Sequence, residues 1–228
     1  MTAVVAMAAL VPPAAAASRV NQMVVFRDGH ARVSQPSMAA TTAKVGRKHC
    51  AVPSATPLAV LIRSGIGPLS LRDYGSCSKR AGDAASLFVA AIGPDRNTGS
   101  DGWVYKSGNV LGTAGAADPA GPLGRGRLRA GARVTWFWCH LSSRDNSCPH
   151  TLVAVAAPGS GSLTVRVRRY DDRGKGVVAP GATVHAGSAT ATAGADGVAH
   201  LTLPAGRYSV FADQPGRIRS FPVKAEVK

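Results

Sequence analysis

The side chains of this chain best able to do chemistry are its four cysteines and the histidines beside two of them. Cys139-His140 and Cys148-Pro149-His150 bring two thiols and two imidazoles together in sequence, a donor set that zinc accepts. Zinc sites usually pair cysteines about two to four residues apart, but eight residues separate these two. The cysteine count is even, and the first residues of the chain resemble a secretory signal, as described below. Together these two features favour disulfides. The pairs that we expect, each close in sequence and flanking loop-like segments, are Cys50–Cys77 and Cys139–Cys148.

Recognisable catalytic motifs are missing from the sequence. It contains no Gly-rich phosphate loop, zinc-protease motif or Gly-x-Ser-x-Gly elbow, and Glu226 is its only glutamate. Asp171-Asp172 could be a calcium-binding or acid–base pair, but adjacent carboxylates before a glycine more often form a turn. We therefore expect no catalytic residues, no metal and no cofactor, although serine, histidine and aspartate side chains could still meet in three dimensions.

Aromatic and basic residues in the middle of the chain are the candidates for ligand binding. All three tryptophans lie there, and a long Gly/Ala/Pro-rich loop from Gly108 to Gly131 carries arginines between them. Such long loops are often functional, whereas tryptophans are more often core residues. The candidate ligand-binding residues are Trp103, Tyr105, Trp136, Trp138, Arg125, Arg127 and Arg129.

The net charge of +15, from 27 Lys+Arg and 12 Asp+Glu, suggests an anionic partner. The basic residues are dispersed and no nucleic-acid motif accompanies them, so specific nucleic-acid binding is not expected. An anionic cell-wall polymer or another surface protein fits this charge better.

The first 17 residues resemble a secretory signal. Thr2 to Val11 is apolar, Pro12-Pro13 breaks the run, and four alanines precede Ser18. The usual basic residues before the run are missing, which suggests a truncated signal. The run is too short to span a bilayer, which needs about 20 apolar residues. We expect a secreted, extracytoplasmic chain without a transmembrane segment, with association with the cell surface as an alternative to free release.

Glycine and proline residues interrupt the chain at short intervals, which predicts many short strands and one helix. Thr56 can cap a helix that starts at Pro57 and ends before Gly65. The expected strands of the first half are Met23 to Phe26, Ala39 to Cys50, Leu69 to Tyr74, Leu87 to Ile92, Trp103 to Lys106, and Arg133 to His140. Both faces of the last strand are apolar, so it should be central and covered on both sides.

A composition change marks the second half of the chain. The composition of residues 157–162 predicts a linker between two domains, residues 18–156 and residues 163–228. After it, six or seven short alternating strands with turn signals predict a small antiparallel sandwich.

The segment from about Cys50 to Leu152 resembles a secreted actinobacterial domain of unknown function, related to the C-terminal β-domain of transcobalamin and intrinsic factor. The matching segments are Thr56-Pro57-Leu58, Tyr74-Gly75-Ser76-Cys77, Gly99 to Tyr105, Gly115 to Pro119, and Arg127 to Cys139. The resemblance implies a β-grasp-like fold with one helix across a mixed sheet. Because that β-domain helps to cover a corrinoid, it also implies a small-molecule (corrinoid-like) carrier as an alternative function.

Residues 160–228 resemble carboxypeptidase-regulatory or transthyretin-like Ig-type modules. The matching segments are Pro180 to Val184 and Leu203 to Val210. The sequence as a whole thus favours a mainly β protein, an α+β β-grasp-like domain followed by an Ig-like sandwich. Its expected role is a non-enzymatic binding or structural protein of the cell envelope, with an extracellular enzyme of unrecognised type as a second alternative.

Overall fold

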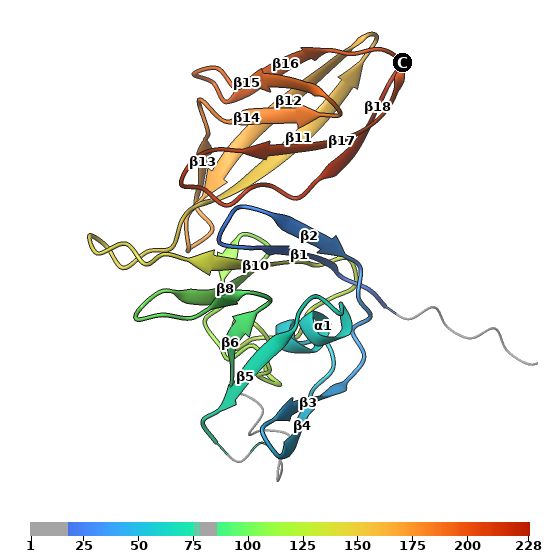
Figure 1. Cartoon of the computed structure of the whole chain (residues 1–228). Coiled ribbons are helices and arrows are strands. Elements are labelled where there is room, and N and C mark those ends of the chain that lie inside the picture. The colour runs from blue at the N-terminus through green and yellow to red at the C-terminus, as the bar shows by residue number, and fades with distance from the viewer. Residues whose placement is uncertain (1–17, 76, 78–85) are drawn as a thin grey trace, which may run out of the picture.

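The computed structural model describes residues 18–75, 77 and 86–228 (Figure 1). The expected signal segment, residues 1–17, lies outside the described residues. Among the residues that are described, no helix is long and apolar enough to cross a membrane.

A five-stranded mixed sheet forms the centre of the first domain. Its strands, in spatial order, are β2 (Ala31–Ser34), β1 (Asn21–Val25), β10 (Arg133–Cys139), β8 (Gly102–Ser107) and β9 (Val110–Leu111). The first and last long strands, β1 and β10, lie side by side and parallel, with Val24 opposite Trp136. The other pairs in the sheet are antiparallel. A parallel central pair flanked by two hairpins is the β-grasp arrangement, which confirms the predicted fold of this domain.

One helix, α1 (Pro57–Arg63), packs beneath this sheet (Figure 1). The hydroxyl oxygen of Thr56 accepts a hydrogen bond from Ala59 N at 3.3 Å, and Pro57 occupies the first turn, where its missing N–H costs nothing. Leu58 and Leu61 are fully buried in the core that α1 shares with β10. The helix therefore begins and packs as its sequence predicts.

Two small sheets complete the first domain. They contain β3 (Thr41–Val45) with β4 (Lys48–Val52), and β5 (Leu69–Asp73) with β6 (Leu87–Ile92) and β7 (Asp95–Arg96). The single strand expected over Ala39 to Cys50 is instead a tight hairpin, because Gly46 takes a left-handed φ of 60° and reverses the chain. A disulfide joins this hairpin to the end of the β5 segment through Cys50 and Cys77.

The second domain is an Ig-like sandwich of two antiparallel sheets. One sheet contains β11 (Thr151–Gly159), β12 (Ser162–Tyr170), β13 (Gly176–Val178) and β16 (Val198–Thr202); the other contains β15 (Ala189–Thr192), β14 (Thr183–Ala186), β17 (Gly206–Asp213) and β18 (Val223–Val227). Inward-facing residues such as Leu163, Val165 and Val184 are fully buried between the sheets.

The structure differs from the expected linker at residues 157–162. These residues form the end of the long β11–β12 hairpin, in which Gly159 lies opposite Ser162. Gly161, with a φ of 59°, permits the turn. A Gly/Ser-rich segment suits a tight turn as well as a linker, so its composition could not distinguish the two. The chain instead passes between the domains in the segment after β10, around the second disulfide, Cys139–Cys148.

The second domain covers the face of the central sheet opposite α1 (Figure 1). Met23, Val25 and Phe137 on that face form one buried cluster with Ile218 of the second domain. The other face carries Val134 and Trp136 into the core around α1. Strand β10 is therefore central and buried on both faces, as its apolar pattern predicted.

Candidate functional site

A cleft of about 790 Å³ opens where the two domains meet. Phe26 and Trp138 of the first domain line it together with the β1–β2 turn, and the loop after β17 lines it from the second domain. Its charged lining residues include three arginines: Arg27, Arg217 and Arg219.

Two of these arginines lie against aromatic rings. The guanidinium carbon of Arg27 is 5.7 Å from the centroid of the Trp138 ring, and that of Arg219 is 3.8 Å from the Phe211 ring. Such stacking fixes the plane of a guanidinium while leaving N–H groups at its edge for a ligand. Burial lowers the pKa of Arg219, with the nearby charge of Asp213 acting in the opposite direction.

None of the three guanidinium groups has a carboxylate oxygen within 4.0 Å in the described part of the chain. The Nε atom of Arg219 is buried and has no hydrogen-bond partner among the described residues. An unsatisfied buried donor is unfavourable and uncommon in folded proteins. The cleft therefore contains three guanidinium groups that form no direct ion pair among the described residues, although Asp28 and Asp213 also line it.

Backbone hydrogen bonds fix both walls of the cleft. Arg27 N donates to the carboxylate of Asp95 at 2.8 Å. On the opposite wall, Ile218 N donates to His150 O at 2.9 Å, and Leu152 N donates to Ile218 O at 2.8 Å. Ile218 is buried, and its neighbours Arg217 and Arg219 both line the cleft. The arginines are thus held on anchored backbone.

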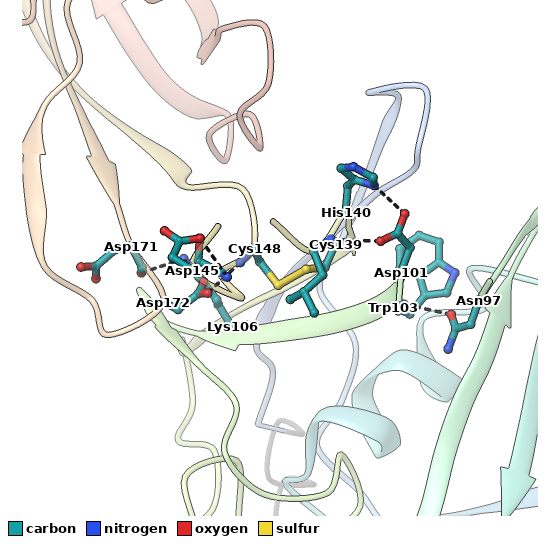
Figure 2. The surroundings of a disulfide bond; sticks show 12 residues. Asn97, Asp101, Trp103, Lys106, Cys139, His140, Asp145, Cys148, Asp171 and Asp172 are labelled. Carbon is teal, nitrogen blue, oxygen red and sulfur yellow. Dashed lines mark hydrogen bonds and ion pairs between the residues drawn. A yellow bond between two sulfur atoms is a disulfide. The ribbon is translucent and has the colours of Figure 1, made fainter. Parts of the chain in front are cut away.

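At the edge of this cleft, His140 and Asp101 are hydrogen-bonded (Figure 2). His140 Nδ1 lies 2.5 Å from one carboxylate oxygen of Asp101, and Leu141 N donates to the other at 3.0 Å. These hydrogen bonds, that of His140 first, hold the pKa of Asp101 below its usual value. In the described residues, no serine or threonine hydroxyl is hydrogen-bonded to His140, so the pair lacks the nucleophile of a hydrolytic triad.

The cysteines are disulfide-bonded in the two pairs that the sequence favoured, Cys50–Cys77 and Cys139–Cys148. A disulfide sulfur cannot serve as a thiolate ligand, so the alternative of a Cys/His metal site at Cys139 and Cys148 is wrong. Cys50 and Cys77 also lie close to Asp73. These two cysteines form a disulfide, so their sulfur atoms are not metal ligands there either.

The adjacent aspartates of the second domain have structural roles. Asp171 accepts hydrogen bonds from the backbone N–H groups of Arg173 and Lys175 and so closes a turn. Asp172 instead accepts from Cys148 N at 2.9 Å and faces Lys106 (Figure 2). The two side chains do not converge on one site.

The arginines expected to contact a ligand lie on a loop that packs against α1. Ala116 O accepts from Leu58 N at 2.7 Å, and Leu128 N donates to Ala55 O at 2.9 Å. Arg127 donates to Pro119 O and to the Ser54 hydroxyl. Arg125, Arg127 and Arg129 are all exposed. Neither Arg125, Arg127 nor Arg129 lines the interdomain cleft.

The candidate aromatic residues separate into two places. Trp138 lines the interdomain cleft, whereas Trp103, Tyr105 and Trp136 line a groove on the other side of β8. Burial raises the pKa of Tyr105, whose hydroxyl donates to Ala114 O at 2.6 Å. Sequence reasoning missed Arg27, Arg217 and Arg219, because single arginines in turns carry no motif.

No protein-family model, curated protein or solved structure matches this chain.

Proposed function

We propose that the protein is a secreted, non-enzymatic binding protein of the cell envelope, whose interdomain cleft binds an anionic group of an envelope polymer. The observation that carries this proposal is the set of three guanidinium groups around the cleft that form no ion pair among the described residues. Arginine suits phosphate and carboxylate groups because its planar fork donates two parallel hydrogen bonds.

The use of the acidic residues supports the same function. Most carboxylates in the described chain accept a backbone N–H and thereby close turns or join segments. These residues are Asp28, Asp73, Asp95, Asp101, Asp118, Asp145, Asp171, Asp172 and Asp196. With the acids committed to structure and a net charge of +15, the positive charge is available to external anions.

Secretion is supported by the apolar leader and the two disulfides, since disulfides persist in oxidising compartments. Expression of the full chain in a host with the matching export system, followed by N-terminal sequencing, tests this part. A mature chain in the medium that starts near Ser18 supports export. An uncleaved chain retained in the cytoplasm contradicts it.

The binding test uses inorganic polyphosphate as the anionic polymer and calorimetry as the readout. We expect Arg27→Gln with Arg217→Gln to weaken binding about tenfold, because each lost guanidinium removes charge-assisted hydrogen bonds. The matched control, Arg125→Gln with Arg129→Gln, changes the net charge equally but lies away from the cleft. Equal weakening in both double variants would mean diffuse attraction and would overturn the cleft assignment. Hydrolysis of the polymer would overturn the non-enzymatic role.

A further inference from the structure

A second hollow, independent of the cleft, follows the edge of β8 that faces away from β10. It has two parts of about 340 and 540 Å³ that share the lining residues Tyr74, Phe88, Trp103, Val104 and Leu111. Ligand sites of small molecules have volumes of about 300–1,000 Å³. We refer to this hollow as the β8 groove.

Exposed aromatic rings mark its mouth. Tyr74 is 70% exposed and Phe88 is 41% exposed, and they are the only exposed aromatic residues among the large hydrophobic ones in the described chain. Their ring centroids are 6.0 Å apart. Exposed aromatic side chains that touch each other over a hollow are unfavourable in water and are typical of a binding surface.

The floor of the groove offers hydrogen bonds. The Nε1 atom of Trp136 is buried and has no partner among the described residues, although Trp136 lines the groove. Along β8, Trp103 N donates to Asn97 and Tyr105 O accepts from Gly112 N. Both residues therefore present their backbone groups away from β10, which directs Trp103 C=O and Tyr105 N–H to the groove side.

The 340 Å³ part of the groove has no charged lining residue, whereas Arg72, Asp101 and Asp172 line the 540 Å³ part. An anion bound there would lose its hydration without gaining an opposite charge. The ligand that this chemistry fits is uncharged and flat, so that it can stack on Tyr74 and Phe88, and carries a hydrogen-bond acceptor.

We propose that the 340 Å³ part of the β8 groove binds an uncharged, planar aromatic small molecule that stacks on Tyr74 and Phe88 and accepts a hydrogen bond from the groove floor. This site is separate from the anion-binding cleft, and neither proposal depends on the other. The probe is Nile red, a neutral planar dye with a carbonyl acceptor, whose emission rises and shifts to the blue in apolar surroundings.

We expect saturable binding of Nile red that is insensitive to salt. The double variant Tyr74→Ser with Phe88→Ser should weaken it about tenfold, as truncation of stacked aromatic contacts does. Both residues are exposed, so the variant should fold. The control Val155→Ser removes a side chain that is 61% exposed on the other domain and should leave the affinity unchanged. Absence of binding, or equal affinity in the double variant, would overturn the proposal.

The anionic dye 8-anilinonaphthalene-1-sulfonate tests the preference for an uncharged ligand. Its binding should be weakened by salt and by Arg27→Gln with Arg217→Gln, and should be unaffected by Tyr74→Ser with Phe88→Ser. If Tyr74→Ser with Phe88→Ser weakens the binding of both dyes, the groove binds charged and uncharged ligands alike. That result would contradict the proposed class of ligand. If Arg27→Gln with Arg217→Gln leaves binding of the anionic dye unchanged, this result contradicts the anion-binding cleft and not the β8 groove.

Discussion

Lys106 of the first domain lies 3.5 Å from the carboxylate of Asp172 in the second domain. Its ammonium group is buried and also donates to Asp171 O at 2.8 Å (Figure 2). It donates to Tyr170 O at 3.2 Å as well. Burial lowers the pKa of Lys106, and the attraction of Asp172 opposes that shift. One lysine therefore satisfies the acceptors of the turn that follows β12 and joins the two domains.

Replacement of Lys106 by methionine should lower the free energy of unfolding by about 3 kcal/mol, because the carbonyls and carboxylate that it satisfies would lose their partner. Denaturation by urea, followed by tryptophan fluorescence, measures the change. Lys44→Met, at an exposed position on β3, is the control and should stay within about 0.5 kcal/mol of the parent. Equal stability of Lys106→Met and the parent would contradict a structural role for the lysine.

The two disulfides should differ in their contributions to stability. Cys50 and Cys77 are 27 residues apart, and Cys139 and Cys148 are 9 apart. Because a longer closed loop restricts the unfolded chain more, we expect losses of about 4 and about 3 kcal/mol respectively. Thermal or chemical unfolding of the two paired Cys→Ala variants gives the order. The reverse order would show that the position of Cys139–Cys148 at the domain junction matters more than loop length.

The loop that carries Arg125, Arg127 and Arg129 should respond unequally to alanine substitution. Arg127→Ala removes hydrogen bonds to Pro119 O and the Ser54 hydroxyl and should cost about 1 kcal/mol of stability. Arg125→Ala and Arg129→Ala remove exposed side chains that form no such hydrogen bonds among the described residues and should stay within about 0.5 kcal/mol. Unfolding curves of the three single variants provide the comparison. Three equal values would argue against a fixed position for Arg127.

The hydrogen bonds of Asp101 should contribute to acid sensitivity. Its hydrogen bonds from His140 and Leu141 place the folded-state pKa of Asp101 below the usual 3.8. The group therefore stabilises the fold above its unfolded pKa, and this stability is lost as pH falls through the lowered folded value. Asp101→Asn should be less stable than the parent at neutral pH and should lose less stability on acidification below about pH 4. Parallel pH profiles of unfolding for the two proteins would contradict this role.

The sequence by itself determined the local elements and the disulfides. Thr56-Pro57 determined the start of α1, since a cap and a proline act within one turn. The two-sided apolar pattern of Arg133–Cys139 was enough to make β10 a central strand. The four cysteines permitted several pairings, and closeness in sequence indicated the right ones. These features depend on near neighbours, which a sequence displays directly.

The tertiary structure decided which residues share a site. Arg27 and Arg217 are 190 residues apart in the chain, and only the packing of the sandwich on the β-grasp sheet brings them to one cleft. Glycine- and serine-rich residues 157–162 became a hairpin turn because β11 and β12 pair along their full length. Trp136 and Trp138 lie two residues apart on one strand and line different hollows. These arrangements depend on contacts between residues that are far apart in the sequence, and a local sequence pattern does not show such contacts.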